Sequence, residues 1–183
     1  MTISPPYTTA PDAERCAAET AAFALLDELA ISFTRVDHEI AGTMEDCLAV
    51  SDALGVRICK NLFLCNRQRT EFYLLCMPED KPFQTKNLSH QIGSARLSFA
   101  SAEDMERLLG CTPGSASILG LMHDTDHRVR LLLDRPVMES EWFGCHPCKN
   151  DGSLKLRTSD VLHVFLPHTG HEPTVVDLPT ETE

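Results

Sequence analysis

The stretch RICKNLFLCNRQRTEFYLLCM, residues 57–77, decides the fold. It holds two apolar runs, 57–65 and 70–77, on either side of the polar segment 66–69. Apolar runs of this length that contain aromatic residues are typical of strands, and a four-residue connection is typical of a hairpin. The stretch therefore predicts two antiparallel strands joined by a short turn.

Helices and further strands are predicted on both sides of this pair. Thr43 with Asp46 forms a capping-box pattern, and Gly55 follows the end of the same helix at Leu54. The predicted helices are 12–30, 43–54, 85–92, 101–110 and 159–166. The further predicted strands are 32–38, 97–100, 118–122, 129–134 and 174–178, and residues 144–152 are expected to be irregular. This order favours an α+β fold, with a curved, mostly antiparallel, barrel-like sheet flanked by helices.

The length of 183 residues suits one domain. Residues 1–10 are rich in Pro and Thr and predict a flexible N-terminal tail. Residues 11–178 are expected to form the single domain, and residues 179–183 an acidic tail. No internal repeat or linker-like segment divides this range.

Composition restricts the partners that the protein can bind. The formal net charge of −11 opposes a broad grip on nucleic-acid phosphates, so we expect no specific DNA binding and only a local contact with any RNA. No stretch approaches the roughly 18–20 apolar residues of a membrane span. With no signal-peptide pattern at the start, we expect a cytoplasmic protein whose eight cysteines are reduced.

Lys60 is the first candidate site residue, because it lies inside the most apolar predicted strand. A lysine is rarely buried without a partner. It either reaches solvent from an edge strand or is a cation held in a cleft to grip a carbonyl or phosphate oxygen. Asn61 points to the opposite face of a regular strand, so both side chains serve one site only if the strand ends or bulges there.

The segment 113–117, Pro-Gly-Ser-Ala-Ser, is the second candidate. A loop of small residues can direct backbone N–H groups at an oxyanion or a ribose. An ordinary turn is the alternative interpretation of this composition.

Cys145-His146-Pro147-Cys148 is open to three interpretations. A zinc site would usually need a second compact ligand pair, which the sequence lacks, although His163, His168 and His171 could supply ligands. A redox dithiol has this spacing, but a turn follows it in place of a helix. In the third interpretation His146 lines a pocket and both cysteines pack in the core. His123 and His127 flank an acidic turn and are expected to be exposed.

Several of these motifs, taken in order, resemble those of the YbaK/ProX-like aminoacyl-tRNA deacylases, the family related to the editing domain of bacterial prolyl-tRNA synthetase. The resemblance covers roughly residues 15–178. The matching motifs are 59–64 (CKNLFL), 72–75 (FYLL), 96–100 (RLSFA), 108–115 (LLGCTPGS), 120–124 (GLMHD) and 144–147 (GCHP), followed by Asn150 and Ser153-Leu154.

The resemblance implies hydrolysis of the ester between an amino acid and the terminal adenosine of tRNA. The Gly-x-His-Pro motif resembles the branch that clears Ala-tRNA(Pro), in which Lys60 and Asn61 take the catalytic positions. The expected substrate-binding residues are His146, Gly114, Ser115, Ala116, His38 and Thr43. No metal or cofactor is implied. The acceptor end of tRNA(Pro) is the expected partner, together with a prolyl-tRNA synthetase.

Other functions stay open at this point. The same site could remove Cys or Ser from tRNA, or could bind an amino acid or nucleotide without catalysis. One departure concerns the loop, because Ile118-Leu119 stands where many relatives have Pro-Phe. The cations nearest the site in sequence, which we expect to meet the acceptor end, are Lys60, Arg67, Arg69, Lys81 and Lys86.

Overall fold

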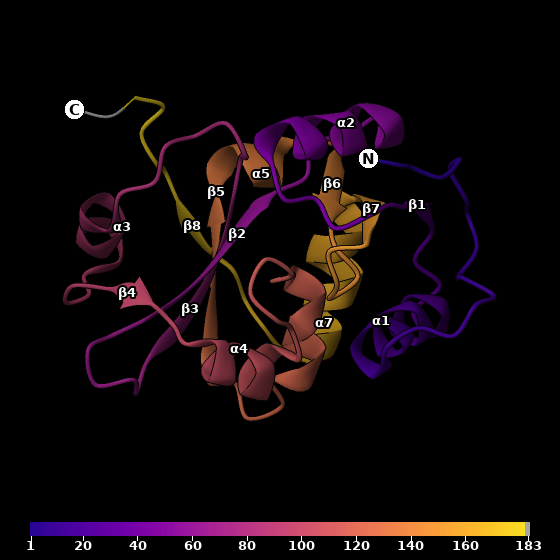
Figure 1. Cartoon of the computed structure of the whole chain (residues 1–183). Helices are drawn as coiled ribbons and strands as arrows, with labels where there is room; N and C mark the ends of the chain where they lie inside the picture. The colour runs from indigo at the N-terminus through magenta and orange to yellow at the C-terminus, as the bar shows by residue number, and fades with distance from the viewer. Residues whose placement is uncertain (182–183) are drawn as a thin grey trace.

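The computed structural model describes residues 1–181, which form two β-sheets with helices packed around them (Figure 1). Residues 182–183 of the predicted acidic tail lie outside this part of the chain. The strands are β1 (Phe33–Asp37), β2 (Lys60–Cys65), β3 (Phe72–Met77), β4 (Ser98–Phe99), β5 (Val129–Asp134), β6 (Trp142–Cys145), β7 (Gly152–Arg157) and β8 (Thr174–Val176). The helices are α1 (Ala17–Glu28), α2 (Met44–Leu54), α3 (Thr85–Ile92), α4 (Ala102–Leu109), α5 (Arg135–Glu139), α6 (Thr158–Asp160) and α7 (Leu166–Thr169).

The predicted hairpin is confirmed and forms the middle of the larger sheet. β2 and β3 pair antiparallel from Lys60–Met77 to Cys65–Phe72, within a five-stranded sheet of order β4-β2-β3-β5-β8. β5 and β8 join it by parallel pairing. The smaller sheet, β1-β7-β6, is antiparallel throughout. The α+β class with mostly antiparallel pairing is therefore confirmed, but the strands of residues 1–181 form two open sheets and no closed barrel.

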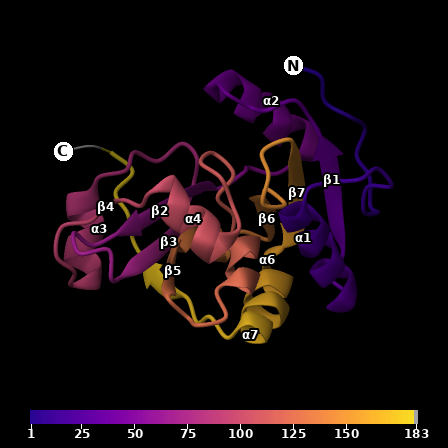
Figure 2. The same cartoon turned by 60° about the horizontal axis from the view of Figure 1, so that its bottom comes forward.

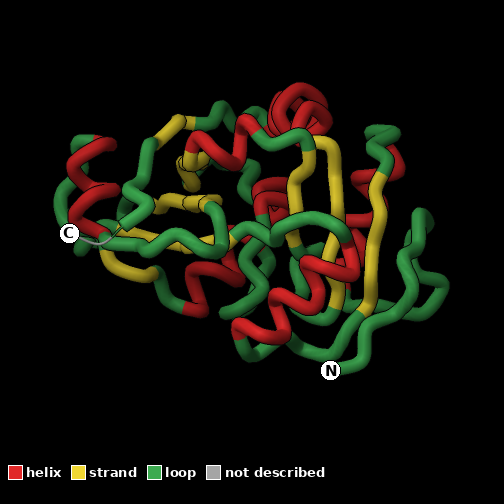
Figure 3. The backbone as a smooth tube through the Cα atoms, turned by 90° about the horizontal axis from the view of Figure 1, so that it is seen from above, coloured by secondary structure: helices red, strands yellow, loops and turns green. Residues whose placement is uncertain are grey.

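Alternation along β2 separates two hydrophobic cores. Phe63 and Cys65 face the larger core, which the smaller sheet, α1 and α4 share. Leu64 faces the other core, where Leu88 of α3 packs. Figure 2 shows the result, with α3 on one flank of the five-stranded sheet and the smaller sheet with α1 on the other. Seen from above, the strands of the two sheets occupy separate halves of the molecule (Figure 3).

The two sheets meet at a close backbone contact. The amide of Cys59 donates to the carbonyl of Gly144 at 3.0 Å, and Ile58 bridges the same residue. A Cβ at position 144 would overlap the carbonyl of Arg57, so only glycine fits there. This junction brings the start of β2, and with it Lys60, beside the smaller sheet.

Local capping chemistry explains why α2 and α4 end where predicted. The Thr43 hydroxyl and Asp46 form the reciprocal capping box of α2, and Gly55 ends that helix in the left-handed conformation. The Ser101 hydroxyl caps α4 by accepting from the Asp104 amide at 3.1 Å, without the reciprocal half of the box.

Three predictions of local structure are wrong. Residues 118–122 lie in a 3-10 helix, Ile118–His123, because the Ser117 hydroxyl accepts from the Leu119 amide and starts a helical turn. The irregular segment predicted for 144–152 overlaps the ends of β6 and β7, which were not predicted as strands. The first helix starts at Ala17 and not at residue 12, because residues 12–16 form bends and irregular backbone.

The C-terminal helix is continuous but irregular. A π-helical turn, Val161–Phe165, joins α6 to α7, where the prediction was one helix over 159–166. Within the described residues, none of the helices combines the length and the apolar character that a membrane span requires.

Candidate active site

A cavity of about 220 Å³ lies between α2, the start of β2 and the outer face of β7. We call it the small cavity. Three of the predicted site residues, Lys60, His38 and His146, line it together. The rest of its wall is mainly apolar and comes from Ala41, Met44, Cys47, Val50, Ile58 and Cys59. A cation and two imidazoles thus gather around a space of amino-acid size.

Lys60 is the first residue of β2 and is half-buried at the edge of the small cavity. Its ammonium donates a hydrogen bond to the carbonyl of Lys81, and within residues 1–181 no carboxylate lies close enough to form an ion pair with it. Burial lowers the pKa of this ammonium, and the negative charge of Asp80 offsets part of the shift. The cation therefore keeps donors for a ligand oxygen.

Ser153 connects the two imidazoles of the small cavity. The Nδ1 of His38 lies 2.7 Å from the carbonyl of Glu39, so this nitrogen carries the proton, and Nε2 accepts from the Ser153 hydroxyl at 2.8 Å. The Nδ1 of His146 lies 2.9 Å from the carbonyl of Gly152 and 3.2 Å from the same hydroxyl. Both side chains are thereby held in one tautomer and one orientation.

His146 is neutral in this arrangement. Burial lowers the pKa of its imidazole, which outweighs the opposing effect of the hydrogen bond to Gly152. Because Nδ1 donates to a carbonyl, Nε2 carries the lone pair, and within the described residues Nε2 has no hydrogen-bond partner. The ring can therefore accept one hydrogen bond from a ligand.

The loop with Gly114, Ser115 and Ala116 does not line the small cavity. It supports the His146 segment from behind instead. The Ser115 hydroxyl accepts from the Asn150 amide at 3.1 Å, and the Ser117 hydroxyl donates to the carbonyl of His146 at 2.6 Å. Gly114 has a φ of 85°, the left-handed conformation that this turn requires.

Asn61 and Thr43 also lie outside the wall of the small cavity. Asn61 points to the face of β2 opposite Lys60, where its amide nitrogen donates to the carbonyl of Cys59 at 3.0 Å and its buried oxygen has no partner among the described residues. The Thr43 hydroxyl is engaged in the capping box of α2. Although β2 begins at Lys60, only Lys60 of these two neighbouring residues lines the small cavity.

Ser153 and Glu79 also line the small cavity, although the sequence did not predict them there. Ser153 had a signal in the alternation of GSLKLR, residues 152–157, because Ser153, Lys155 and Arg157 share the face opposite Leu154 and Leu156. Glu79 carried no local signal, since it lies in the loop after β3 and binds Arg57 at 3.1 Å.

Two of the cations expected to meet RNA are engaged elsewhere. Lys81 is buried, and its ammonium lies 2.6 Å from a carboxylate oxygen of Asp134 and 2.7 Å from the carbonyl of Leu178. Arg69 forms an ion pair with Asp104 at 2.7 Å. The expectation for Lys81 is wrong because its charge is neutralised inside the protein.

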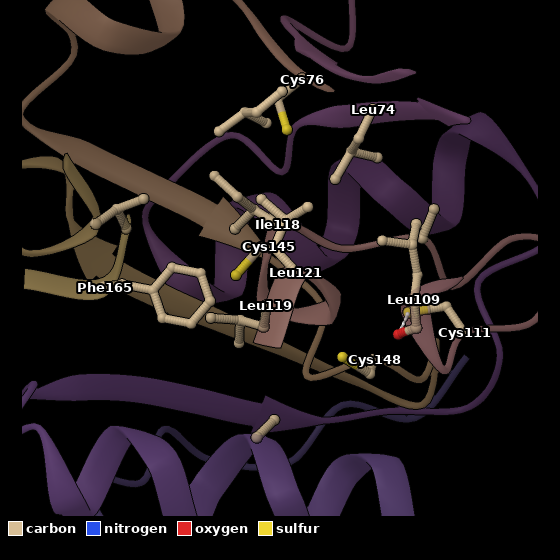
Figure 4. Close-up of a cluster of buried hydrophobic side chains, with 14 of the residues drawn as sticks. Leu74, Cys76, Leu109, Cys111, Ile118, Leu119, Leu121, Cys145, Cys148 and Phe165 are labelled. Carbon is tan, nitrogen blue, oxygen red and sulfur yellow. Dashed lines mark hydrogen bonds between the residues drawn. The ribbon is translucent and has the colours of Figure 1, made fainter. Parts of the chain in front are cut away.

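Cys145 and Cys148 lie in the larger core among side chains such as Leu119, Leu121 and Phe165 (Figure 4). Burial raises the pKa of the Cys145 thiol. In the described part of the chain, no three His, Cys, Asp or Glu side chains are grouped to hold a metal ion. The arrangement thus agrees with the interpretation in which both cysteines are packing residues.

Fold and site together define a small α+β domain with a cavity lined by a lysine, two histidines and mainly apolar side chains. The chain belongs to the aminoacyl-tRNA editing domain family, whose family model matches residues 38–164.

Relatives and a solved structure agree with this assignment. The chain is 31% identical to the "Prolyl-tRNA editing protein ProX" of Acetoanaerobium sticklandii, over 79% of this chain and 88% of that protein. It is 29% identical to the "Prolyl-tRNA synthetase associated domain-containing protein 1" of Danio rerio, over 82% of each. A crystal structure described as a candidate trans-editing enzyme for prolyl tRNA synthetase superposes with a TM-score of 0.67 at 14% identity, over 91% of this chain and all of that one, and shows the shared fold.

Proposed function

We propose that this chain is a trans-editing deacylase that hydrolyses mischarged tRNA(Pro), with Ala-tRNA(Pro) as its main substrate. The observation that carries the proposal is the small cavity, where the Lys60 ammonium and the neutral His146 lie at one apolar, amino-acid-sized space. Membership of the editing family and the names of the relatives point to the same chemistry.

In the proposed reaction, water attacks the ester carbonyl. The C–O bond to the terminal ribose breaks, and the products are the free amino acid and a tRNA with a free hydroxyl. The Lys60 ammonium stabilises the oxyanion that develops on the carbonyl oxygen. No carboxylate or imidazole of the cavity is needed as a base, because a free ribose hydroxyl of the substrate assists the attacking water.

The neutral His146 has a second role in this proposal. A bound aminoacyl ester carries an α-ammonium group, which can donate to the free Nε2 lone pair of His146. A protonated imidazole would repel that group. His38 and Ser153 maintain the required tautomer, as their hydrogen bonds indicate.

The remaining predicted residues take positioning roles. Asn61 holds the turn before Lys60 through its bond to Cys59. The loop of Gly114, Ser115 and Ala116 positions the segment that carries His146. Thr43 fixes the start of α2, the helix that lies over the small cavity.

Size is the proposed basis of specificity. A volume of about 220 Å³ is below the roughly 300–1,000 Å³ of pockets for larger ligands. Proline has only two more carbon atoms than alanine, so we propose that the wall of the cavity, and not its volume alone, excludes the proline ring and admits alanine. An apolar wall rejects an added hydroxyl only about 100-fold at most, so some activity on Ser-tRNA(Pro) is expected.

The proposal extends to the partners and to the extent of the domain. A single editing domain over residues 11–178 would act in the cytoplasm on the acceptor end of tRNA(Pro), after its release from prolyl-tRNA synthetase.

The direct test compares deacylation of tRNA(Pro) charged with Ala, Ser, Cys or Pro. We expect the fastest turnover on Ala, slower turnover on Ser and Cys, and none on Pro. Lys60→Ala should lose turnover, whereas Arg96→Ala, a matched change of an exposed cation far from the cavity, should not. Wild-type protein that binds charged tRNA but hydrolyses none of the four would favour the non-catalytic alternative.

A further inference from the structure

A second and larger cleft, of about 600 Å³, adjoins the small cavity. We call it the outer cleft. The two spaces share Ile58 and Cys59, and consecutive residues of one loop line them, Glu79 the small cavity and Asp80 the outer cleft. Helix α5 and Trp142 complete the wall of the outer cleft. A ligand extending from the small cavity past Lys60 therefore meets the outer cleft.

Two cations lie close to the ring of Trp142 on the smaller sheet. The Lys155 ammonium is 4.5 Å and the Arg157 guanidinium 4.7 Å from the centre of its ring. Trp142 is on β6 opposite Arg157 of β7, and its side chain is partly exposed. No other tryptophan occurs in the chain.

The same row of side chains on β7 starts in the small cavity. Ser153, Lys155 and Arg157 alternate on one face of the strand, and Ser153 lines the small cavity. The row covers about 13 Å, four residues at roughly 3.3 Å each. It thus leads from the candidate active site to Trp142.

Three cations lie at or beside the outer cleft: Arg57 is in its wall, and Lys155 and Arg157 line a neighbouring hollow that shares Trp142 with it. Arg57 is 67% exposed at its side chain and shares its charge with Glu79. Lys155 has no carboxylate within ion-pair distance among the described residues, and the contact of Arg157 with Glu141 is long, at 3.9 Å. Asp80 and Glu141 also line the cleft, which limits how many phosphates it can hold.

We propose that the outer cleft binds the unpaired 3′-terminal nucleotides of the tRNA, with a base stacked on Trp142. This inference rests on the proposed function. The amino acid in the small cavity is esterified to the terminal ribose, so the preceding nucleotides must leave along the adjoining surface.

The composition of this surface favours single-stranded RNA over a duplex. Aromatic rings that stack on bases, next to cations that meet phosphates, are the usual features of single-strand binding. A duplex would need a broad row of unpaired cations, which a chain of net charge −11 does not present here. Arg57, Lys155 and Arg157 meet the phosphates in this arrangement.

Trp142 fluorescence provides the test. The probe is an uncharged RNA hairpin with a short unpaired 3′ end, and the control is the same hairpin with a blunt end. We expect saturable quenching by the first and little by the second. The double variant Lys155→Gln/Arg157→Gln should weaken the binding, and Arg96→Gln should leave it unchanged. No quenching, or equal quenching by the blunt hairpin, would overturn the inference.

Turnover on the aminoacylated hairpin gives a second readout. Trp142→Ala should raise KM about ten-fold or more with little change in kcat, and Trp142→Phe should recover most of the loss because it still stacks. An equal defect in both variants would indicate a structural role and contradict the proposal.

The two proposals fail in different ways. The uncharged hairpin carries no amino acid, so its binding is measured even if the protein hydrolyses nothing. Normal turnover without quenching would overturn only the proposal that the outer cleft binds RNA. Saturable quenching without turnover would support that proposal and contradict the deacylase proposal.

Discussion

Lys60 and Lys81 lie next to each other, and they show how differently two lysines of one protein can be used. The ammonium of Lys60 donates to the backbone carbonyl of Lys81, has no carboxylate partner among residues 1–181 and borders the small cavity. The ammonium of Lys81 is buried against Asp134 and binds the carbonyl of Leu178. The Lys60 charge stays available for a ligand, whereas the Lys81 charge pairs with Asp134 and links the C-terminal segment to β5.

The comparison teaches that apolar surroundings do not identify a functional lysine. Lys60 lies inside an apolar run and Lys81 follows one, and both were expected near the candidate active site from their positions in the sequence. The two lysines differ in whether a carboxylate neutralises them. Asp134 is fully buried and needs a cation beside it, and Lys81 provides that cation. Lys60 neutralises no buried carboxylate among the described residues.

Removing the Lys81 charge should have the largest effect on stability. Lys81→Met leaves the buried Asp134 carboxylate without its cation, which costs about 3–5 kcal/mol for a broken buried pair. Urea unfolding measures the loss, and Lys81→Met/Asp134→Leu should recover part of it. A single variant as stable as wild type would end the distinction between the two lysines.

Removing the Lys60 charge should affect turnover and not stability. Lys60→Ala should lower kcat on Ala-tRNA(Pro) by about 100- to 1,000-fold, the usual effect of deleting one oxyanion donor. Its unfolding free energy should change by less than about 1 kcal/mol, since the side chain is half-buried and forms no ion pair within residues 1–181. Turnover near wild type in this folded variant would remove Lys60 from the mechanism.

The pH profile should sharpen the assignment to Lys60. Burial lowers the pKa of its ammonium, so the active cation is lost as pH rises, earlier than for an exposed lysine. We expect kcat to fall about ten-fold per pH unit above that pKa. Lys60→Arg should retain part of the activity and move the alkaline decline to higher pH, and an unmoved decline would point to another group.

The smallest effect concerns the neutral imidazole opposite Lys60. The pKa of His146 is lowered in the folded state, so the unfolded chain binds its proton first as pH falls. Stability is therefore complete above the unfolded value, near 6.5, and declines below it by up to about 1.4 kcal/mol per pH unit.

His146→Gln is the matched variant for this effect. It should flatten the difference in unfolding free energy between pH 7.5 and pH 5.5. The same decline in wild type and variant would assign the acid sensitivity to another group.

Sequence reached the parts of the fold that depend on neighbouring residues. The capping box of Thr43 and Asp46, the left-handed Gly55 and the hairpin of residues 57–77 each follow from contacts within a few positions. β6 and β7 were missed because Gly144 and Gly152 interrupt their patterns, and the first of these glycines is required by a distant strand.

In the candidate active site, too, the residues with local signals were predicted and the distant contacts were not. Lys60 and His146 stand out in sequence because a cation in an apolar strand and the Gly-x-His-Pro motif are local signals. The contact of Ser153 with His38 could not be predicted from sequence, because the two residues lie 115 positions apart and meet only through the β1–β7 pairing.

By itself, the sequence determined the ends of α2 and α4, the central hairpin, the acidic charge that limits RNA contact and the motifs of the editing family. Only the tertiary structure decided which lysine is free, which nitrogen of His146 keeps its lone pair and that Trp142 borders a cleft beside the small cavity. The reason is physical: propensity and capping act over a few residues, whereas burial, ion pairing and tautomer depend on groups that meet only when distant segments pack.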